Sequence, residues 1–411
     1  MPVFNLMHRV CLLALSSLLA LASVAPQAFA HQEHQQHGGM ASAKAGELGT
    51  GAAVDAQGKL WIATKQTTPG GQYVVLQASS DMGKTWSPPR RIQRQPEPVS
   101  ADGEDRPKLA FGAHGEIYIA YTSPLAKPYT GQIRFVRSVD GGQTFAAPIT
   151  VHANRDVITH RFDSIIVDRA GRIFIAWIDK RDLEAAAARK EKYTGAALYY
   201  AVSDDGGASF KGDYKIADHS CECCRIALAL NSQGQPVALW RHVFDADTRD
   251  HALAVLSPDG RIAAPVRASF DNWHVNACPH QGPALAYAAD GTRHQAWFNV
   301  RDEEGGVFYA AADASGHLGV PVRLGSAQAE HADVALQGKT IALAWRQFDG
   351  KSTAILSRLS HDGGLTWQDR SLAHTQGASD QPHLLQTRAG ILLVWRTRDE
   401  GVRVVSINPE E

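Results

Sequence analysis

The chain has 411 residues, a formal net charge of −1 and 44% hydrophobic residues. A nearly neutral chain lacks the basic excess that nucleic-acid-binding proteins usually carry, so we expect no nucleic-acid partner. The length suffices for one large all-β domain or two ordinary domains, each with a substantial core.

Residues 1–30 have the organisation of a secretory signal peptide. His8 and Arg9 form a weak basic region, "VCLLALSSLLALASVA" is the apolar region, and "AFA" at residues 28–30 is a small-x-small cleavage site. We therefore expect a mature chain that begins at His31 and is secreted across the inner membrane into the periplasm. No other stretch approaches ~20 continuous apolar residues, so we expect no membrane span after cleavage.

The next segment, residues 31–47, is polar and lacks periodicity, which predicts a disordered tail. It carries His31, His34 and His37, followed by Met40. A solvated linker and a weak metal-collecting tail are both consistent with this composition, because His-rich tracts bind metals.

The remaining chain, residues 48–411, contains a repeated octapeptide of the form S-x-D-x-G-x-[ST]-[WF]. It occurs as "SSDMGKTW", "SVDGGQTF", "SDDGGASF" and "SHDGGLTW", with two weaker copies around Asp259 and Asp313. The Asp can accept hydrogen bonds from turn N–H groups, the Gly supplies positive φ, and the aromatic residue can anchor the turn to the core. Strand patterns flank each copy, so each octapeptide is predicted to be a hairpin tip.

A second repeat consists of two apolar strands joined by a glycine turn, with an aromatic residue near the end of the second strand. It recurs at intervals of roughly 50 residues, and each interval holds about four strands, the content of a propeller blade. The turn glycines are Gly58, Gly115, Gly171, Gly234, Gly291, Gly338 and Gly390. Residues 182–193 carry the one helical pattern.

The octapeptides resemble the Asp boxes of the sialidase-like (BNR-repeat) β-propellers, and the resemblance covers nearly the whole mature chain. It implies an all-β fold, a single β-propeller over residues 48–411, with each Asp box between the third and fourth strands of a blade. The count of glycine turns favours seven blades, with six as the alternative if a terminal unit merges with another.

Propeller topology places the Asp boxes on the face opposite to the starts of the innermost strands. Ligand sites normally lie where innermost strands begin and second strands end, so the Asp boxes indicate the fold rather than a substrate. The residues expected at this mouth are rich in Arg, His and Cys. They are Asp105, Arg106, His160, Arg161, Asp163, Cys224, Arg225, Cys278, His280, Gln281, Glu330, His331, Asp380, Gln381 and His383, with Arg241, Arg346 and Arg396 at second-strand ends.

The four cysteines of the mature chain fall at equivalent places in adjacent repeats. Cys221 and Cys278 each precede a turn glycine by thirteen residues, and Cys223 and Cys224 complete the "CECC" motif. As a hypothesis, the four cysteines bind a soft metal, copper favoured over zinc, because thiolate and imidazole suit these ions. The flanking imidazoles proposed as ligands are those of His219 and His280.

In this interpretation the protein handles metal in the periplasm, with the ion and another periplasmic protein as partners. Arg225, beside the cluster, would lower the pKa of a thiol. The alternative is two structural disulfides, one between Cys221 and Cys278 and a vicinal one between Cys223 and Cys224, since exported cysteines usually oxidise. That alternative leaves a propeller that binds only proteins.

The resemblance also implies a further possible function, an exo-α-sialidase-like glycoside hydrolase acting on an acidic sugar. Arg241, Arg346 and Arg396 each follow a Trp and could form a carboxylate clamp. The Arg-Ile-Pro motif of sialidases is absent, however, since "DRPKL" at Asp105 is not an equivalent, and no Tyr–Glu nucleophile pair can be placed. We therefore assign no catalytic residue and do not expect a functional sialidase.

Overall fold

The computed structural model describes residues 48–407, apart from residues 246 and 302. The predicted signal peptide and the tail with His31, His34 and His37 lie outside these described residues. All described residues belong to one compact unit. Within them, no helix is both long and apolar enough to cross a lipid bilayer.

The described chain is built almost entirely from antiparallel β-sheets, and the first two sheets follow the sequence order of their strands. The first contains β1 (Gly51–Val54), β2 (Leu60–Thr68), β3 (Gly71–Ser79) and β4 (Arg90–Arg91). The second contains β5 (Lys108–Phe111), β6 (Ile117–Pro124), β7 (Gly131–Ser138) and β8 (Ile149–Thr150).

The middle of the chain forms one eight-stranded sheet that consists of two four-strand sets. The first set contains β9 (His160–Val167), β10 (Ile173–Asp179), β11 (Ala196–Ser203) and β12 (Lys211–Ser220). The second contains β13 (Ala227–Leu230), β14 (Pro236–Phe244), β15 (Thr248–Val255) and β16 (Val266–Arg267). Strands β12 and β14 join the sets through the pairing of Ser220 with His242.

Three further sheets complete the described chain, and the last has three strands. The first contains β17 (Ala284–Tyr287), β18 (Arg293–Arg301), β19 (Glu304–Ala312) and β20 (Val322–Leu324). The next contains β21 (Ala329–Gln337), β22 (Thr340–Phe348), β23 (Thr353–Ser360) and β24 (Gln368–Thr375). The last contains β25 (His383–Gln386), β26 (Ile391–Thr397) and β27 (Gly401–Ser406).

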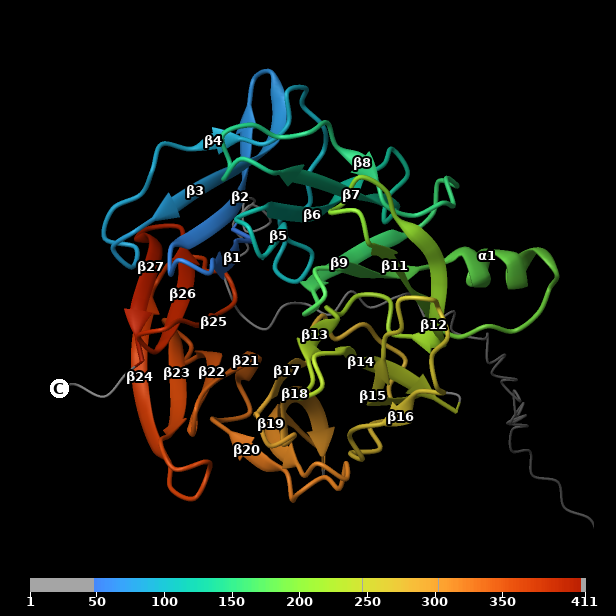
Figure 1. The fold of residues 1–411 in the computed structure, drawn as a ribbon. Coiled ribbons are helices and arrows are strands. Elements are labelled where there is room, and N and C mark those ends of the chain that lie inside the picture. Colours follow the sequence, from blue (N-terminus) through green and yellow to red (C-terminus); the bar gives the residue numbers. More distant parts are fainter. Residues whose placement is uncertain (1–47, 246, 302, 408–411) are drawn as a thin grey trace, which may run out of the picture. The chain divides into compact units, whose positions relative to one another are not determined.

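The first strands of successive sets lie side by side in a closed cycle. Contacts run from β1 to β5, β9, β13, β17, β21 and β25 in turn, and β25 contacts β1 again. Figure 1 shows these strands nearest the centre, with the red strands at the end of the described chain beside the blue strands at its beginning. Sheets that radiate from such a cycle form a β-propeller, so this part of the predicted fold is confirmed.

The hydrophobic core lies between neighbouring sheets. All seven residues of β10 are buried, because a second strand is covered by another sheet on each face. One cluster joins Tyr118 and Phe135 of the second sheet to Ile173 and Trp177 of the next set. Apolar residues on both faces of a strand therefore bind each sheet to its two neighbours.

The four octapeptides form one recurring turn between the third and fourth strands of their sets. In the second copy, the Ser138 hydroxyl donates to Asp140 Oδ1 at 2.7 Å and accepts the Gly142 N–H at 2.8 Å. The Thr144 N–H also donates to Asp140 Oδ1, at 2.9 Å. The copies at Asp81, Asp205 and Asp362 repeat this pattern.

The aromatic residue that ends each octapeptide packs across to the preceding sheet. The ring of Phe210 meets that of Phe135 edge-on at 5.0 Å between centroids, and Trp367 meets Tyr309 at 5.5 Å. Trp86 packs with Val404 of β27, which closes the cycle between the last and first sheets. The sequence predicts an aromatic anchor between turn and core, and the structure shows that this anchor also joins neighbouring sheets.

The single described helix, α1 (Arg181–Ala188), connects β10 to β11 and ends before the predicted limit at residue 193. Lys190 takes a φ of 58°, and the Glu191 N–H donates to the Ala186 carbonyl at 2.9 Å. This left-handed residue with a bond back to the last turn is a helix stop that does not require glycine. The predicted helix was therefore correct in place and too long at its end.

Candidate functional site

Three sulfur atoms lie together in the crossover from β12 to β13. Cys221 Sγ is 3.9 Å from Cys223 Sγ and 3.5 Å from Cys224 Sγ. All three sulfurs lie within 4.8 Å of one another, and all three side chains are buried. None of the four described cysteines forms a disulfide in this structure, and the two Cys221 separations far exceed the S–S bond length of about 2.05 Å.

Backbone hydrogen bonds fix this crossover where it leaves β12. Ser220 ends β12 and pairs with His242, and the Cys221 N–H donates to the Arg241 carbonyl at 2.9 Å. The chain then turns into the innermost strand β13. The C-x-C-C motif thus sits at the start of an innermost strand, where the repeat spacing predicts it.

Cys278 completes the cluster from the segment that precedes β17. Its side chain is half-buried and packs against the hydrophobic cluster that contains the other three cysteines. Hydrogen bonding between thiols couples the pKa of Cys278 to Cys221 and Cys223. Cys278 is not one of the three sulfurs that lie within 4.8 Å of one another. The structure therefore gives three buried sulfur donors in one group and a fourth, half-buried cysteine packed beside them.

The cluster concentrates negative charge on one sulfur. Hydrogen bonds from the thiols of Cys223, Cys224 and Cys278 lower the pKa of Cys221 well below its usual range, with a further contribution from Arg241. Hydrogen bonding to Cys221 raises the pKa of Cys278 to about 12. Hydrogen bonding within the cluster therefore favours ionisation of Cys221 over that of Cys278.

The cation near the cluster differs from the one that the sequence suggested. Arg225 was expected to lower a thiol pKa, but its guanidinium donates to the carbonyls of Pro283 at 3.0 Å and Ala332 at 2.5 Å. Arg241 instead acts on both Cys221 and Cys224. Arg225 is adjacent to the cysteines in sequence, but its side chain binds the carbonyl oxygens of Pro283 and Ala332 instead of approaching a sulfur.

The two flanking histidines lie outside the 4.8 Å sulfur group. His219 Nδ1 is 3.0 Å from the Thr194 carbonyl, and its ring lies 4.8 Å from that of Tyr193. His280 is exposed, takes a φ of 53° and lies two residues after Cys278.

Two residues near the cluster had no signal in the sequence that singled them out. His251, within β15, is completely buried, and its Nε2 atom has no hydrogen-bond partner. Burial lowers its pKa well below the usual range, and Arg241 and Cys221 both act on it. Glu104 is 4% exposed and reaches both cysteine-bearing segments.

Glu104 lies at the centre of a network across the mouth. Burial raises its pKa, but the Arg225 guanidinium and a hydrogen bond with His331 outweigh burial and bring the value to about 2. His331 Nδ1 lies 3.3 Å from Glu104 Oε1, and His331 Nε2 lies 3.8 Å from Glu330 Oε2. The mouth is therefore charged and strongly paired, as its residue types predict.

A second set of mouth carboxylates, which includes Asp105 and Asp163, is paired less completely than Glu104. Asp163 is completely buried, and burial raises its pKa to about 6. Thr122 Oγ1 donates to Asp105 Oδ1 at 2.6 Å and lies 3.3 Å from Asp163 Oδ1, while Asp163 Oδ2 has no partner. Arg161 Nε donates to Asp105 Oδ2 at 3.0 Å.

The three arginines of the possible carboxylate clamp are held differently. Arg241 is 1% exposed and donates to Asn299 Oδ1 at 3.1 Å and to the Gln281 carbonyl at 3.1 Å. Arg346 donates to Glu330 Oε1 at 2.7 Å. Arg396 is half-buried in β26. The guanidinium groups of Arg241 and Arg346 are thus bound to protein acceptors rather than presented to a ligand.

A Tyr–Glu pair, which the sequence could not place, does exist between the first two sheets. Tyr121 donates to Glu97 Oε1, and Arg134 Nε donates to Glu97 Oε2 at 3.0 Å. Tyr121 is fully buried, and burial together with the Glu97 charge raises the pKa of its phenol far above the usual range. This pair therefore stabilises the contact between sheets and does not resemble an accessible nucleophile.

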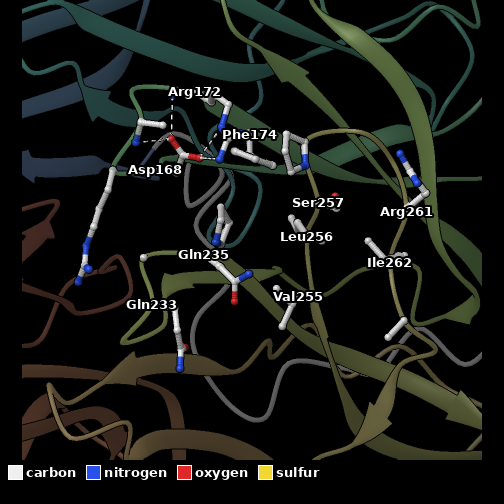
Figure 2. Close-up of a pocket in the computed structure, with 16 residues that line it drawn as sticks. Asp168, Arg172, Phe174, Gln233, Gln235, Val255, Leu256, Ser257, Arg261 and Ile262 are labelled. Atoms are coloured by element: carbon white, nitrogen blue, oxygen red, sulfur yellow. Dashed lines mark hydrogen bonds and ion pairs between the residues drawn. The ribbon is translucent and has the colours of Figure 1, made fainter.

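A cavity of about 490 Å³ lies on the face that carries the octapeptide turns, between the hairpin turns after β9 and β13 and the loop after β15 (Figure 2). Phe174, Leu256 and Ile262 supply apolar surface to it. Its carboxylate, Asp168, accepts from Arg172 Nε at 2.7 Å. The cavity offers apolar surface and arginines, and it contains no cysteine or histidine among its lining residues.

Comparisons with known proteins identify a fold and no family. The sequence matches no known protein family and no curated protein. An ulvan lyase of a new polysaccharide lyase family, solved with a glucuronic acid–sulfated rhamnose ligand, is similar in structure with a TM-score of 0.57 and 12% identity. The match covers 90% of this chain and 96% of that one. At this identity, the similarity shows the fold alone.

Two further solved structures are similar at lower scores. A protein of unknown function from Dyadobacter fermentans DSM 18053 has a TM-score of 0.49 and 16% identity over 74% of this chain and 91% of that chain. The NanB sialidase from Streptococcus pneumoniae has a TM-score of 0.47 and 8% identity over 73% of this chain and 65% of that one.

Proposed function

We propose that this protein binds a soft metal ion, copper in the first place, through Cys221, Cys223, Cys224 and Cys278. The observation that carries the proposal is the group of three buried sulfur atoms within 4.8 Å, with Cys278 beside it. Thiolates are the ligands that select Cu(I), and zinc is the other common ion that accepts them. The ion is the cargo of a metal-handling protein.

The surroundings of the sulfurs favour metal binding over disulfide exchange. An exchange centre needs an accessible thiolate as its nucleophile. Here Cys221, Cys223 and Cys224 are all buried, and Cys278 is only half-exposed. A thiolate that faces inward toward other sulfurs is suited to hold an ion rather than to attack a partner.

The wider setting of the proposal follows the sequence. We infer a seven-bladed, Asp-box propeller of the sialidase-like kind, exported to the periplasm, where another protein supplies or receives the ion. The strand sets that begin with β1, β5, β9, β13, β17, β21 and β25 support this blade number for the described residues. Loose binding by the tail histidines His31, His34 and His37 would add a second, weaker capture point.

Metal analysis of the purified protein tests the main proposal. The wild type and a Cys221→Ser/Cys223→Ser/Cys224→Ser variant are purified under reducing conditions, loaded with Cu(I) or Zn(II), desalted and measured by elemental analysis. We expect about one ion per wild-type chain and none above background in the variant. Equal metal content in the two proteins would disprove the proposal.

A thiol count on denatured, unreduced protein separates metal binding from the disulfide alternative. Four titratable thiols after purification without oxidation support the thiolate site. No free thiol and no bound metal would instead indicate a protein-binding propeller with bridges such as Cys221–Cys278 and Cys223–Cys224. Both outcomes are decided by one measurement with a thiol reagent.

A second candidate function is cleavage of an acidic polysaccharide or glycoside, and the fold shared with the ulvan lyase favours it. The commitments of Arg241 and Arg346 to protein acceptors speak against a carboxylate clamp of the sialidase kind. Assays with a fluorogenic sialoside and with a uronate-containing polysaccharide test this candidate. Turnover that disappears in Arg346→Ala would replace the metal-handling proposal as the main function.

A further inference from the structure

We propose that Glu104 is the positioning residue that holds the Cys278 segment against the buried Cys221–Cys223–Cys224 group, so that Cys278 becomes the fourth ligand of the ion. This inference rests on the proposed metal site and specifies how that site is assembled. Glu104 belongs to the segment before β5, whereas the cysteines precede β13 and β17. The residue therefore reaches across the mouth from another sheet.

One carboxylate oxygen joins the two cysteine-bearing segments. Glu104 Oε2 accepts the Arg225 N–H at 2.6 Å and the Gly282 N–H at 2.8 Å. Arg225 directly follows Cys224, and Gly282 lies four residues after Cys278. Backbone N–H groups that converge on a buried carboxylate form strong, charge-assisted hydrogen bonds. A single oxygen atom thus binds both segments, beside the direct bond from Arg225 Nε to the Pro283 carbonyl.

The other carboxylate oxygen keeps Glu104 in this orientation. Glu104 Oε1 lies 3.6 Å from the Arg225 guanidinium and 3.3 Å from His331 Nδ1. With 4% of its surface exposed, the carboxylate has little freedom to turn toward solvent. Because both carboxylate oxygens have hydrogen-bond or ion-pair partners, the Glu104 side chain is held in one orientation. It links the starts of β13, β17 and β21, and we call this link the bracket.

The packing of Gly282 shows how closely the segments approach each other. A Cβ atom at this position would lie 2.3 Å from Arg225 Cγ and 2.5 Å from the Arg225 carbonyl oxygen. Only glycine permits such an approach without displacement of the neighbouring backbone. Glu104 and Gly282 therefore act together. The carboxylate accepts hydrogen bonds from both segments, and the absence of a side chain at Gly282 allows the two backbones to approach each other.

Three variants test the role of Glu104. Glu104→Ala removes the bracket, whereas Glu104→Gln keeps a carbonyl oxygen that can accept both N–H groups. Glu330→Gln is the matched control, since this mouth carboxylate binds Arg346 and makes no hydrogen bond to either cysteine segment among the described residues. Each protein is loaded with Cu(I), and affinity is measured by competition with a Cu(I) chelator.

The decisive readout is the alkylation of Cys278 with and without Cu(I), followed by mass spectrometry. In the wild type, in Glu104→Gln and in Glu330→Gln, we expect bound Cu(I) to protect Cys278. In Glu104→Ala, we expect Cys278 to stay reactive and the Cu(I) affinity to fall by about 10- to 100-fold, the usual effect of a residue that orients metal ligands. Protection of Cys278 and wild-type affinity in Glu104→Ala would overturn the inference.

Hydrogen exchange of the metal-free proteins separates this inference from the proposed function. The amide hydrogens of Arg225 and Gly282 should exchange slowly in the wild type and much faster in Glu104→Ala, with Glu104→Gln close to the wild type. Unchanged exchange in Glu104→Ala would refute the bracket while the metal site stands. Failure of the wild type to bind Cu(I) would overturn the function and, with it, the role of Cys278 as a ligand.

Discussion

The two faces of the propeller carry aspartates in opposite electrostatic states. On the Asp-box face, hydrogen bonds from Thr85 and Ser79 lower the pKa of Asp81 to about 2. At the mouth, burial raises the pKa of Asp163 to about 6. Asp81 is thus stabilised in its charged form by hydrogen bonds, whereas the charged form of Asp163 is destabilised by burial.

This difference indicates where function resides. Every box repeats one hydrogen-bond pattern that stabilises a turn, whereas the mouth contains an unpartnered oxygen on Asp163 and a group of buried thiols. Positive φ values at Phe162, His280 and His331 add local backbone strain at the same mouth. Strain and unsatisfied charge tend to gather at functional sites because folding alone would not select them.

The largest expected effect concerns the mouth. Cys221→Ser should weaken Cu(I) binding by more than about 100-fold, beyond the effect of a residue that only orients ligands. Cys278→Ser should cause a smaller loss, because Cys278 is half-buried and Cys221 contacts all the other thiols. Chelator competition measures both affinities. Equal losses of Cu(I) affinity in the two variants would contradict a larger contribution of Cys221 than of Cys278.

A substitution on the Asp-box face should affect stability without affecting metal binding. The Cβ of Gly207→Ala would lie 2.5 Å from the Phe135 ring, at a φ of 82°. We expect a loss of about 2–4 kcal/mol in the free energy of unfolding, from overpacking and left-handed strain together. Urea denaturation measures the loss, and Cu(I) affinity should stay at the wild-type value.

Gly206→Ala is the matched control for this prediction. Its φ is 66°, but the nearest atom, Arg137 NH1, lies 3.6 Å from the added Cβ. Only the backbone strain of about 1–2 kcal/mol should appear. If both glycine variants lost the same stability, the contact between Gly207 and Phe135 would have no energetic role.

The third prediction concerns the buried carboxylate of Asp163. Its folded-state pKa of about 6 exceeds the ordinary 3.8, so its stabilising contribution is complete below pH 3.8 and lost as the pH rises through 6. At pH 7.5 the wild type therefore carries the cost of a buried charge. Asp163→Asn should raise the free energy of unfolding at pH 7.5 by about 1–3 kcal/mol, with no gain at pH 4.

Asp140→Asn provides the contrast on the other face. Hydrogen bonds from Thr144 lower the Asp140 pKa, so its contribution is present above pH 3.8 and is lost at lower pH. Its amide variant should lose stability at pH 7.5 rather than gain it. Denaturation curves at both pH values decide the comparison, and a gain in both variants would remove the distinction between the faces.

The smallest expected effect tests the equivalence of the boxes. Ser138→Ala and Ser203→Ala each remove a buried hydroxyl that donates to the box aspartate and accepts a glycine N–H. Each should lower the free energy of unfolding by about 1 kcal/mol. Thermal or urea denaturation checks the pair, and a silent substitution at either serine would show that the boxes are not equivalent.

The sequence predicted much of the fold because its signals are local and repeated. Each octapeptide contains the donors, the acceptor and the glycine of its own turn, so four copies could be recognised without distant contacts. The start of α1 followed its local pattern, whereas its end depended on the conformation of Lys190. The repeat spacing also placed Cys221 and Cys278 at neighbouring strand starts.

The sequence by itself determined the turns, the strands and the gathering of four cysteines at one mouth. Only the tertiary structure decided which charges act on those cysteines, since Arg241 rather than Arg225 reaches them. It also brought Glu104 to partners 121 and 178 residues away, Arg225 and Gly282. Such contacts leave no periodic trace in the sequence, because they depend on how a closed ring of sheets aligns its loops.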